Sequence, residues 1–84
     1  MILKIGSVEH QQPPVIKEVE AELTDSFAIV ADRACQAHGY HGNYSLRLPS
    51  GAVPGRRMNL EDDEEFMSFS GDEVFSLVNV GAEG

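Results

Sequence analysis

The sequence predicts a small α+β domain in which one helix packs on one face of a β-sheet. Three observations support this prediction. Apolar and polar residues alternate in segments near both ends of the chain, which is the pattern of half-buried strands. One segment near the middle places its apolar residues at helical spacing. The 84 residues have room for a single hydrophobic core, so a single domain is expected.

The N-terminal part of the chain is predicted to form a β-hairpin. Residues 1–8 (MILKIGSV) alternate, and Leu3 and Ile5 share the face predicted to point into the core. Residues 15–23 (VIKEVEAEL) alternate more strictly, with a mainly apolar face made of Val15, Lys17, Val19, Ala21 and Leu23. Their other face carries Ile16, Glu18, Glu20 and Glu22. The connection is polar and contains the pair 13–14, two prolines that cannot donate ladder hydrogen bonds, so it is predicted to be a loop.

A helix is predicted to follow over residues 27–38 (FAIVADRACQAH). Either Asp25 or Ser26 suits the N-cap position, where a side-chain oxygen accepts from a free backbone amide. The apolar face of this helix carries Phe27, Val30, Ala31 and Ala34. Gly39 is a natural C-terminal stop, because glycine readily adopts the left-handed conformation found there.

The third predicted strand is YSLRL, residues 44–48, and it ends before a segment rich in turn residues. Its alternation turns Leu46 and Leu48 inward and leaves Arg47 outside, followed by Pro49. Beyond the turns, Met58 and Leu60 are expected to form a short strand or edge.

The C-terminal part is predicted to complete the core and the sheet. Three apolar residues, Phe66, Met67 and Phe69, are expected in the core, followed by a Gly-Asp turn at residues 71–72. The last strand, EVFSLVNV, directs Phe75 and Leu77 to one face. Its opposite face carries Val74, Ser76, Val78 and Val80.

The net charge of −8, from 14 acidic and 6 basic residues, disfavours nucleic acid and anionic membranes as partners. The chain has no apolar run of about 18 residues, the length of a membrane span. Its first residues lack the pattern of a signal peptide, and Cys35 has no second cysteine with which to form an internal disulfide. These features predict a soluble, cytoplasmic protein. The acidic charge either serves solubility alone or steers the protein toward basic partner surfaces.

Two clusters are weighed as chemical sites. Cys35, His38 and His41 recur at intervals of three residues, but no further Cys/His pair completes a four-ligand zinc site. A Cys-His nucleophile would also need an orienting group and an oxyanion site, so we expect a partly exposed thiol, no metal and no cofactor. The acidic run 61–65 is either a docking surface for a basic partner or a solvated loop, with Arg56 and Arg57 nearby to pair with it.

The element order resembles the β-grasp fold of ubiquitin, ββαβ(β)β, with a mixed sheet packed on one helix. The likeness is most detailed at TDSFAIVADRACQAHGY, which has Asp25 and Ser26 at the cap and Gly39 followed by Tyr40 at the end. The last strand also follows an acidic turn and leads into a short tail ending at Gly84. The resemblance implies a β-grasp domain over residues 1–80 and a flexible tail over residues 81–84.

This sequence departs from ubiquitin in three respects. Glu83 stands before Gly84 where ubiquitin and its sulfur-carrier relatives have Gly-Gly, and Lys4 and Lys17 are the only lysines. The third strand also lacks an exposed aliphatic residue. These departures favour a distant relative such as the ubiquitin-like modifiers of bacterial conjugation operons. That resemblance implies an activating enzyme, a conjugating enzyme and a JAB-type peptidase as partners, together with target proteins.

The function implied by the resemblance is that of a protein modifier, which is a protein substrate and not an enzyme. The carboxylate of Gly84 would be activated with ATP and Mg²⁺ held by the activating enzyme and then joined to target amines. In the tail, Gly81 and Ala82 are small enough to thread a narrow channel, whereas Glu83 is bulky and charged. The expected partner-binding surface consists of Arg47, Pro49, Val78 and Val80.

The alternative is a non-covalent β-grasp adaptor, or a subunit of a larger enzyme or secretion complex. Such a protein would use the face of its sheet, and Gly84 would be a plain chain end or a residue exposed by processing.

Overall fold

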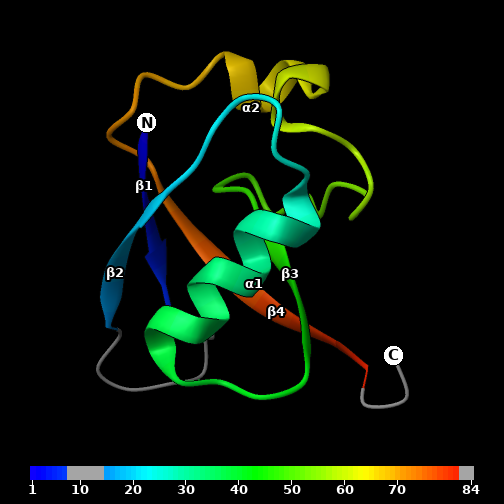
Figure 1. The fold of residues 1–84 in the computed structure, drawn as a ribbon. Helices are drawn as coiled ribbons and strands as arrows, with labels where there is room; N and C mark the ends of the chain where they lie inside the picture. Colours follow the sequence, from blue (N-terminus) through cyan, green and yellow to red (C-terminus); the bar gives the residue numbers. More distant parts are fainter. Residues whose placement is uncertain (8–14, 82–84) are drawn as a thin grey trace.

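The computed structural model describes residues 1–7 and 15–81, and it forms one α+β domain (Figure 1). The strands are β1 (Ile2–Gly6), β2 (Ile16–Glu20), β3 (Asn43–Arg47) and β4 (Val74–Gly81). The helices are α1 (Phe27–His38), the 3₁₀ turn η1 (Leu60–Asp62) and the short α2 (Glu64–Met67).

The four strands form one mixed sheet in the order β2-β1-β4-β3. The two outer pairs, β1 with β2 and β3 with β4, are antiparallel, whereas the central strands β1 and β4 run parallel. Figure 1 shows α1 crossing one face of this sheet. The predicted α+β class, the mixed sheet and the single main helix are therefore confirmed, and the strand order is compatible with a β-grasp.

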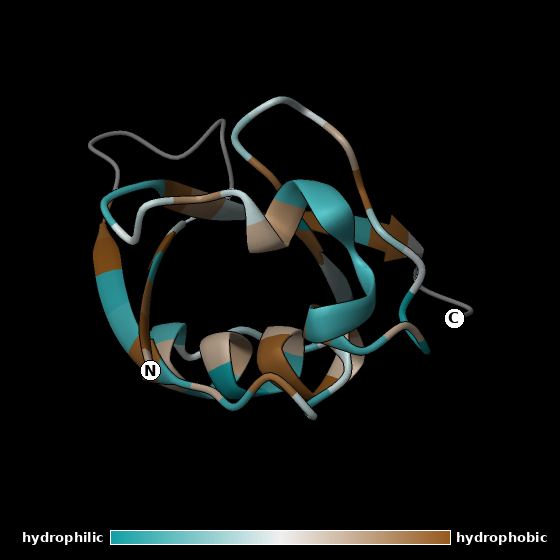
Figure 2. Ribbon diagram, turned by 90° about the horizontal axis from the view of Figure 1, so that it is seen from above, coloured by the Kyte–Doolittle hydropathy of each residue, from teal (hydrophilic) through white to brown (hydrophobic). Residues whose placement is uncertain are grey.

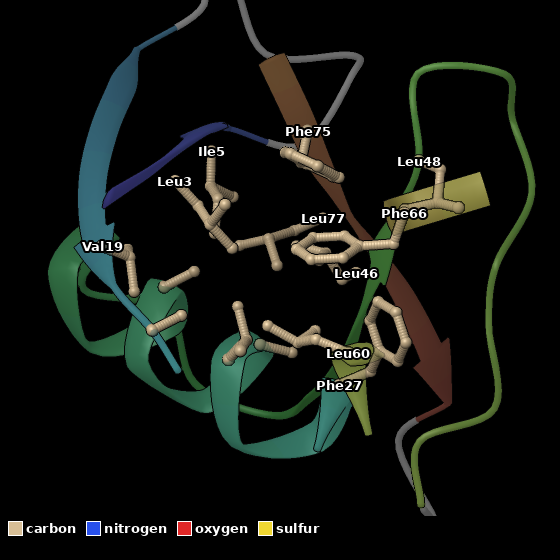
Figure 3. Packing of buried hydrophobic residues seen from close by; sticks show 14 of the residues in the cluster. Leu3, Ile5, Val19, Phe27, Leu46, Leu48, Leu60, Phe66, Phe75 and Leu77 are labelled. Carbon is tan, nitrogen blue, oxygen red and sulfur yellow. The ribbon is translucent and has the colours of Figure 1, made fainter. Parts of the chain in front are cut away.

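The hydrophobic core lies between α1 and the inner face of the sheet (Figure 3). Every strand contributes inward residues to it, as the alternation predicted: Leu3, Ile5, Val19, Leu46, Phe75 and Leu77. The helix contributes Phe27, Val30, Ala31, Ala34 and Cys35. Seen from above, α1 lies along one side of the ribbon and carries alternating hydrophilic and hydrophobic residues (Figure 2). Burial of its apolar face supplies most of the stability of such a helix.

Both ends of α1 are capped. Ser26 is the N-cap, and its hydroxyl accepts from the Ile29 amide at 3.3 Å, which decides between the two candidate caps. Asp25 instead accepts from the Glu22 amide at 3.0 Å. Gly39 ends the helix in the left-handed conformation with φ of 78°, as predicted.

The short strand expected at Met58 and Leu60 does not form. Here the chain packs against the start of α1, where the Phe27 amide donates to Met58 O at 2.9 Å and the Ala28 amide to Arg56 O at 3.0 Å. Leu60 is fully buried and is the first residue of η1. Among the described residues, the only β-bridge of this segment joins Asn59 to Ser26. This segment therefore satisfies helix amides that would otherwise lack partners.

Three residues expected to face the core are exposed instead. Met67 is 48% exposed because α2 is a single turn that buries its neighbour Phe66, and adjacent helical residues point in different directions. Val15 and Leu23 are 40% and 39% exposed, since they lie beyond the two ends of β2.

Candidate protein-binding face

The outer face of the sheet, opposite α1, carries the largest exposed aliphatic residues of the strands. Ile2 and Ile16 are 52% and 53% exposed, and Val74 and Val80 are 43% and 45% exposed. They alternate with the buried core residues along the same strands, so they point away from α1. We call this set of four residues, with the half-buried Val78, the outer apolar face.

The strand register brings the predicted binding residues Arg47 and Val78 to neighbouring strands on this face. Arg47 lies opposite Ser76, and Ser45 lies opposite Val78. The Arg47 Nε donates to Ser76 Oγ at 3.2 Å, which holds the guanidinium against β4. Of the other predicted residues, Val80 is exposed on β4, and Pro49 is exposed two positions after the end of β3. The structure thus gives Arg47, Val78 and Val80 a shared surface.

Ile2, Ile16 and Val74 were not among the expected binding residues, although they extend the same face. Lys4 lies opposite Val74 on one side and opposite Glu18 on the other, which places a basic side chain between β2 and β4. The alternation in the sequence already indicated this, because adjacent strand residues point to different faces of the sheet. Ile2 therefore points away from the face that Leu3 occupies, and Ile16 away from that of Val15. What the sequence did not give was the strand order, which sets β1 beside β4.

The predicted tail begins at the end of β4. Gly81 belongs to this strand and is in register with Asn43 of β3. Ala82, Glu83 and Gly84, which include the expected site of conjugation, lie outside the described residues.

Two residues of the Cys/His cluster contact the interior of the fold: Cys35 lies in the hydrophobic core and His38 contacts β1. Cys35 is 7% exposed and belongs to the hydrophobic cluster, so the expectation of a partly exposed thiol was wrong. Burial raises the pKa of the Cys35 thiol, Asp32 raises it further, and Arg56 opposes them. The His38 Nε2 lies 3.0 Å from Ile5 O, and its ring stacks on Tyr40 with centroids 5.2 Å apart. Among the described residues, no group of three His, Cys, Asp or Glu side chains is arranged to hold a metal ion.

The acidic run forms short helical turns, not an irregular loop. Residues 61–62 belong to η1, and the Asp63 carboxylate caps α2 by accepting from the Phe66 amide at 2.8 Å. Arg56 does not pair with this run, contrary to expectation. Its guanidinium donates to Tyr44 O and lies 3.9 Å from Asp32, between β3 and α1.

No protein-family profile matches this chain, and a search of curated proteins finds no match either. In residues 1–7 and 15–81, no helix has the length and apolar character needed to cross a membrane.

Proposed function

We propose that this chain is a ubiquitin-like β-grasp protein modifier. It docks on partner proteins through the outer face of its sheet, and the carboxylate of Gly84 is joined to target amines. Two observations support this proposal. The strand order β2-β1-β4-β3 is compatible with a β-grasp, and α1 covers one face of the sheet while the opposite face carries exposed aliphatic residues.

The observation that carries the proposal is the position of β4. This strand holds Val78 and Val80 on the outer apolar face and also leads directly to the C-terminal residues. Gly84 is four positions after Val80, a span of at most about 14 Å of extended chain. An activating enzyme docked on these valines therefore has the terminal carboxylate within reach of its own active site.

The proposed chemistry needs no catalytic residue from this chain. A Gly84 carboxylate oxygen attacks the α-phosphorus of ATP on the activating enzyme and releases pyrophosphate. An enzyme thiolate then displaces AMP to form a thioester, and a target amine displaces that thiolate to form an isopeptide bond. The chain's own thiol, Cys35, is buried and its pKa is raised, so it does not compete as a nucleophile. Glu83 requires a roomy or basic subsite in the activating enzyme.

The test is intact mass spectrometry of the tagged protein isolated from its native host, beside a variant lacking Gly84. Heavier adducts that disappear in the deletion and contain an isopeptide through Gly84 are the expected result. A variant extended by one blocked residue after Gly84 should behave like the deletion. The free protein mass alone in all three samples would contradict conjugation.

The second candidate is a non-covalent adaptor, or a subunit of a larger enzyme or secretion complex. The observation that favours it is the extent of the outer apolar face, because Ile2 and Ile16 lie on β1 and β2 and not on β4, the strand that leads to the tail. An adaptor tolerates loss of Gly84 but loses its partner when Val78→Asp or Arg47→Glu alters the face. A modifier also docks through this face, so the Gly84 deletion distinguishes the two functions: partners still co-purify with the deletion variant of an adaptor, whereas the covalent adducts of a modifier disappear.

A further inference from the structure

A small cavity opens at the end of the domain where β1 begins. It lies between the start of β1 and the segment that leads from α2 into β4, and Figure 1 shows these two parts of the chain at the same end of the molecule. Its volume is about 70 Å³, several times the roughly 15 Å³ that one water molecule needs. The cavity therefore has room for the end of one ligand side chain.

Apolar side chains form most of the lining of this cavity. Met1 is 48% exposed and Phe69 is half-buried, so both stand at the opening. Leu3, Phe66 and Phe75 are buried and form the floor. The complete lining consists of Met1, Leu3, Phe66, Phe69, Gly71, Glu73 and Phe75. The cavity is thus a hollow at the margin of the hydrophobic core.

The phenylalanine rings of the lining contact one another. The ring centroids of Phe69 and Phe75 are 5.5 Å apart, those of Phe66 and Phe75 5.7 Å, and those of Phe66 and Phe69 6.3 Å. The ring planes are inclined to one another by 39° to 70°. The face of an aromatic ring attracts a cation, so a lining of inclined rings suits a ligand that joins an alkyl chain to a positive charge.

Glu73 carries the one charged side chain among the described residues of the lining. Its Oε2 accepts from the Ser70 amide at 3.1 Å and from the Ser70 hydroxyl at 3.2 Å, and its Oε1 accepts from the Gly71 amide at 3.0 Å. The hydrogen bond from the Ser70 amide lowers the pKa of Glu73, although desolvation opposes it, so the carboxylate is ionised at neutral pH. A carboxylate has about four acceptor sites, which leaves Oε1 able to accept from a ligand.

The charge around the cavity also favours a basic ligand. Asp72 is exposed beside Glu73, and Glu22 lines an open hollow that shares Met1 with the cavity. The terminal amine of Met1 donates to Ala21 O at 2.8 Å, which engages this positive charge near the end of β2. The net charge of −8 attracts basic partner surfaces in general, and the cavity adds a specific place for one basic side chain.

We propose that this cavity, which we call the phenylalanine pocket, binds a lysine side chain of a partner protein. The alkyl stem of the lysine packs against Leu3 and the three rings, and its ammonium group lies at the opening and donates to Glu73. Arginine fits less well, because its planar guanidinium carries more N–H donors than this single carboxylate can accept. The pocket uses neither Gly84 nor the outer apolar face, so the proposal stands whether or not the chain is a modifier.

The test titrates the full-length protein with an acetylated, amidated peptide of sequence GGKGG and follows it by NMR. Binding should shift the ring signals of Phe69 and the amide signal of Gly71. A peptide with norleucine in place of lysine keeps the alkyl stem but lacks the ammonium group, and should bind at least about fivefold more weakly. Equal affinity for the two peptides, or no shift at Phe69 up to the solubility limit of GGKGG, would overturn the proposal.

Matched charge removals separate the pocket from general attraction to an acidic protein. Glu73→Gln removes the charge from the lining and should weaken GGKGG binding by about fivefold or more while leaving norleucine binding unchanged. Asp72→Asn makes the same charge change at the exposed neighbouring position and should leave the affinity for GGKGG within about twofold. Equal losses in the two variants would show non-specific attraction and contradict the proposed pocket.

A ring substitution tests the aromatic part of the pocket. Phe69→Leu keeps an apolar side chain at the opening and removes one ring, so it should lower the preference for lysine over norleucine by at least about twofold. An unchanged preference in this variant would contradict binding of the cation beside the rings. If Glu73→Gln weakens norleucine binding too, the turn at residues 70–73 has changed shape, and the Phe69→Leu comparison decides the question.

Discussion

The two faces of the sheet use alternate residues of the same strands for different purposes. On the inner face, Ile5 and Leu77 are at most 2% exposed beneath α1. On the outer face, Ile2 and Val80 are each about half exposed. The residues are similar in chemistry, so their roles follow from which face they occupy. The inner face stabilises the fold, and the outer face has aliphatic surface available to a partner.

The largest expected effect is on the inner face. Leu77→Ala removes a fully buried side chain from the centre of the sheet and should lower the free energy of unfolding by about 2–5 kcal/mol. Val80→Ala, three positions along the same strand on the outer face, should change it by less than about 0.5 kcal/mol. Urea unfolding of both variants measures the difference. Similar losses in the two would contradict the division between the faces.

Cys35 reports on the covered side of α1. Because the thiol is buried and its pKa is raised, native protein at pH 8 should react with iodoacetamide at least about tenfold more slowly than protein unfolded in urea. The matched control is Gln36→Cys in a Cys35→Ser background, which moves the thiol to the exposed neighbouring position. Equal rates at positions 35 and 36 would show that α1 does not cover the inner face in this way.

The helix that covers the inner face depends on its cap. Ser26→Ala removes the hydroxyl that accepts from the Ile29 amide and should lower the free energy of unfolding by about 1 kcal/mol. Thr24→Ala, an exposed residue two positions earlier, provides the control and should be close to neutral. Thermal unfolding followed by circular dichroism compares the two. A larger loss for Thr24→Ala would place the cap elsewhere.

The smallest expected effect is a dependence on acid pH. The hydrogen bond from the Glu22 amide lowers the pKa of Asp25 below its ordinary value of 3.8. Desolvation raises this pKa, and Arg33 lowers it further. A lowered pKa in the folded state contributes stability above pH 3.8, which is lost as the pH falls through the folded-state pKa. Asp25→Asn should therefore flatten the stability profile below about pH 4 relative to the unsubstituted protein. Identical slopes in urea titrations at pH 2.5 to 5 would contradict this contribution.

Alternation and helical spacing predicted much of the fold, because both follow directly from which side chains are buried. They identified the four strands, the core face of each and α1 with its Gly39 stop. They did not predict η1 and α2, since five consecutive acids show no helical apolar pattern and the turns are held by a local cap at Asp63. Local patterns also gave no information about Arg56, whose partners Tyr44 and Asp32 lie on other elements.

The candidate site was predicted in part for the same reason. The sequence indicated that Val74, Val78 and Val80 share the outward face of one strand, but only the order β2-β1-β4-β3 places Ile2 and Ile16 on the same side of the sheet. Sheet order is a long-range property of the chain, which local sequence patterns do not specify.

The most direct test of conjugation through Gly84 compares intact masses of the tagged protein and its Gly84 deletion, both isolated from the native host. We expect heavier adducts in the wild type that are absent from the deletion and that resolve to an isopeptide through Gly84. Val78→Asp should reduce the same adducts while leaving the protein folded, because it alters the outer apolar face and not the core. Adducts that persist without Gly84, or a complete absence of adducts, would contradict conjugation through Gly84.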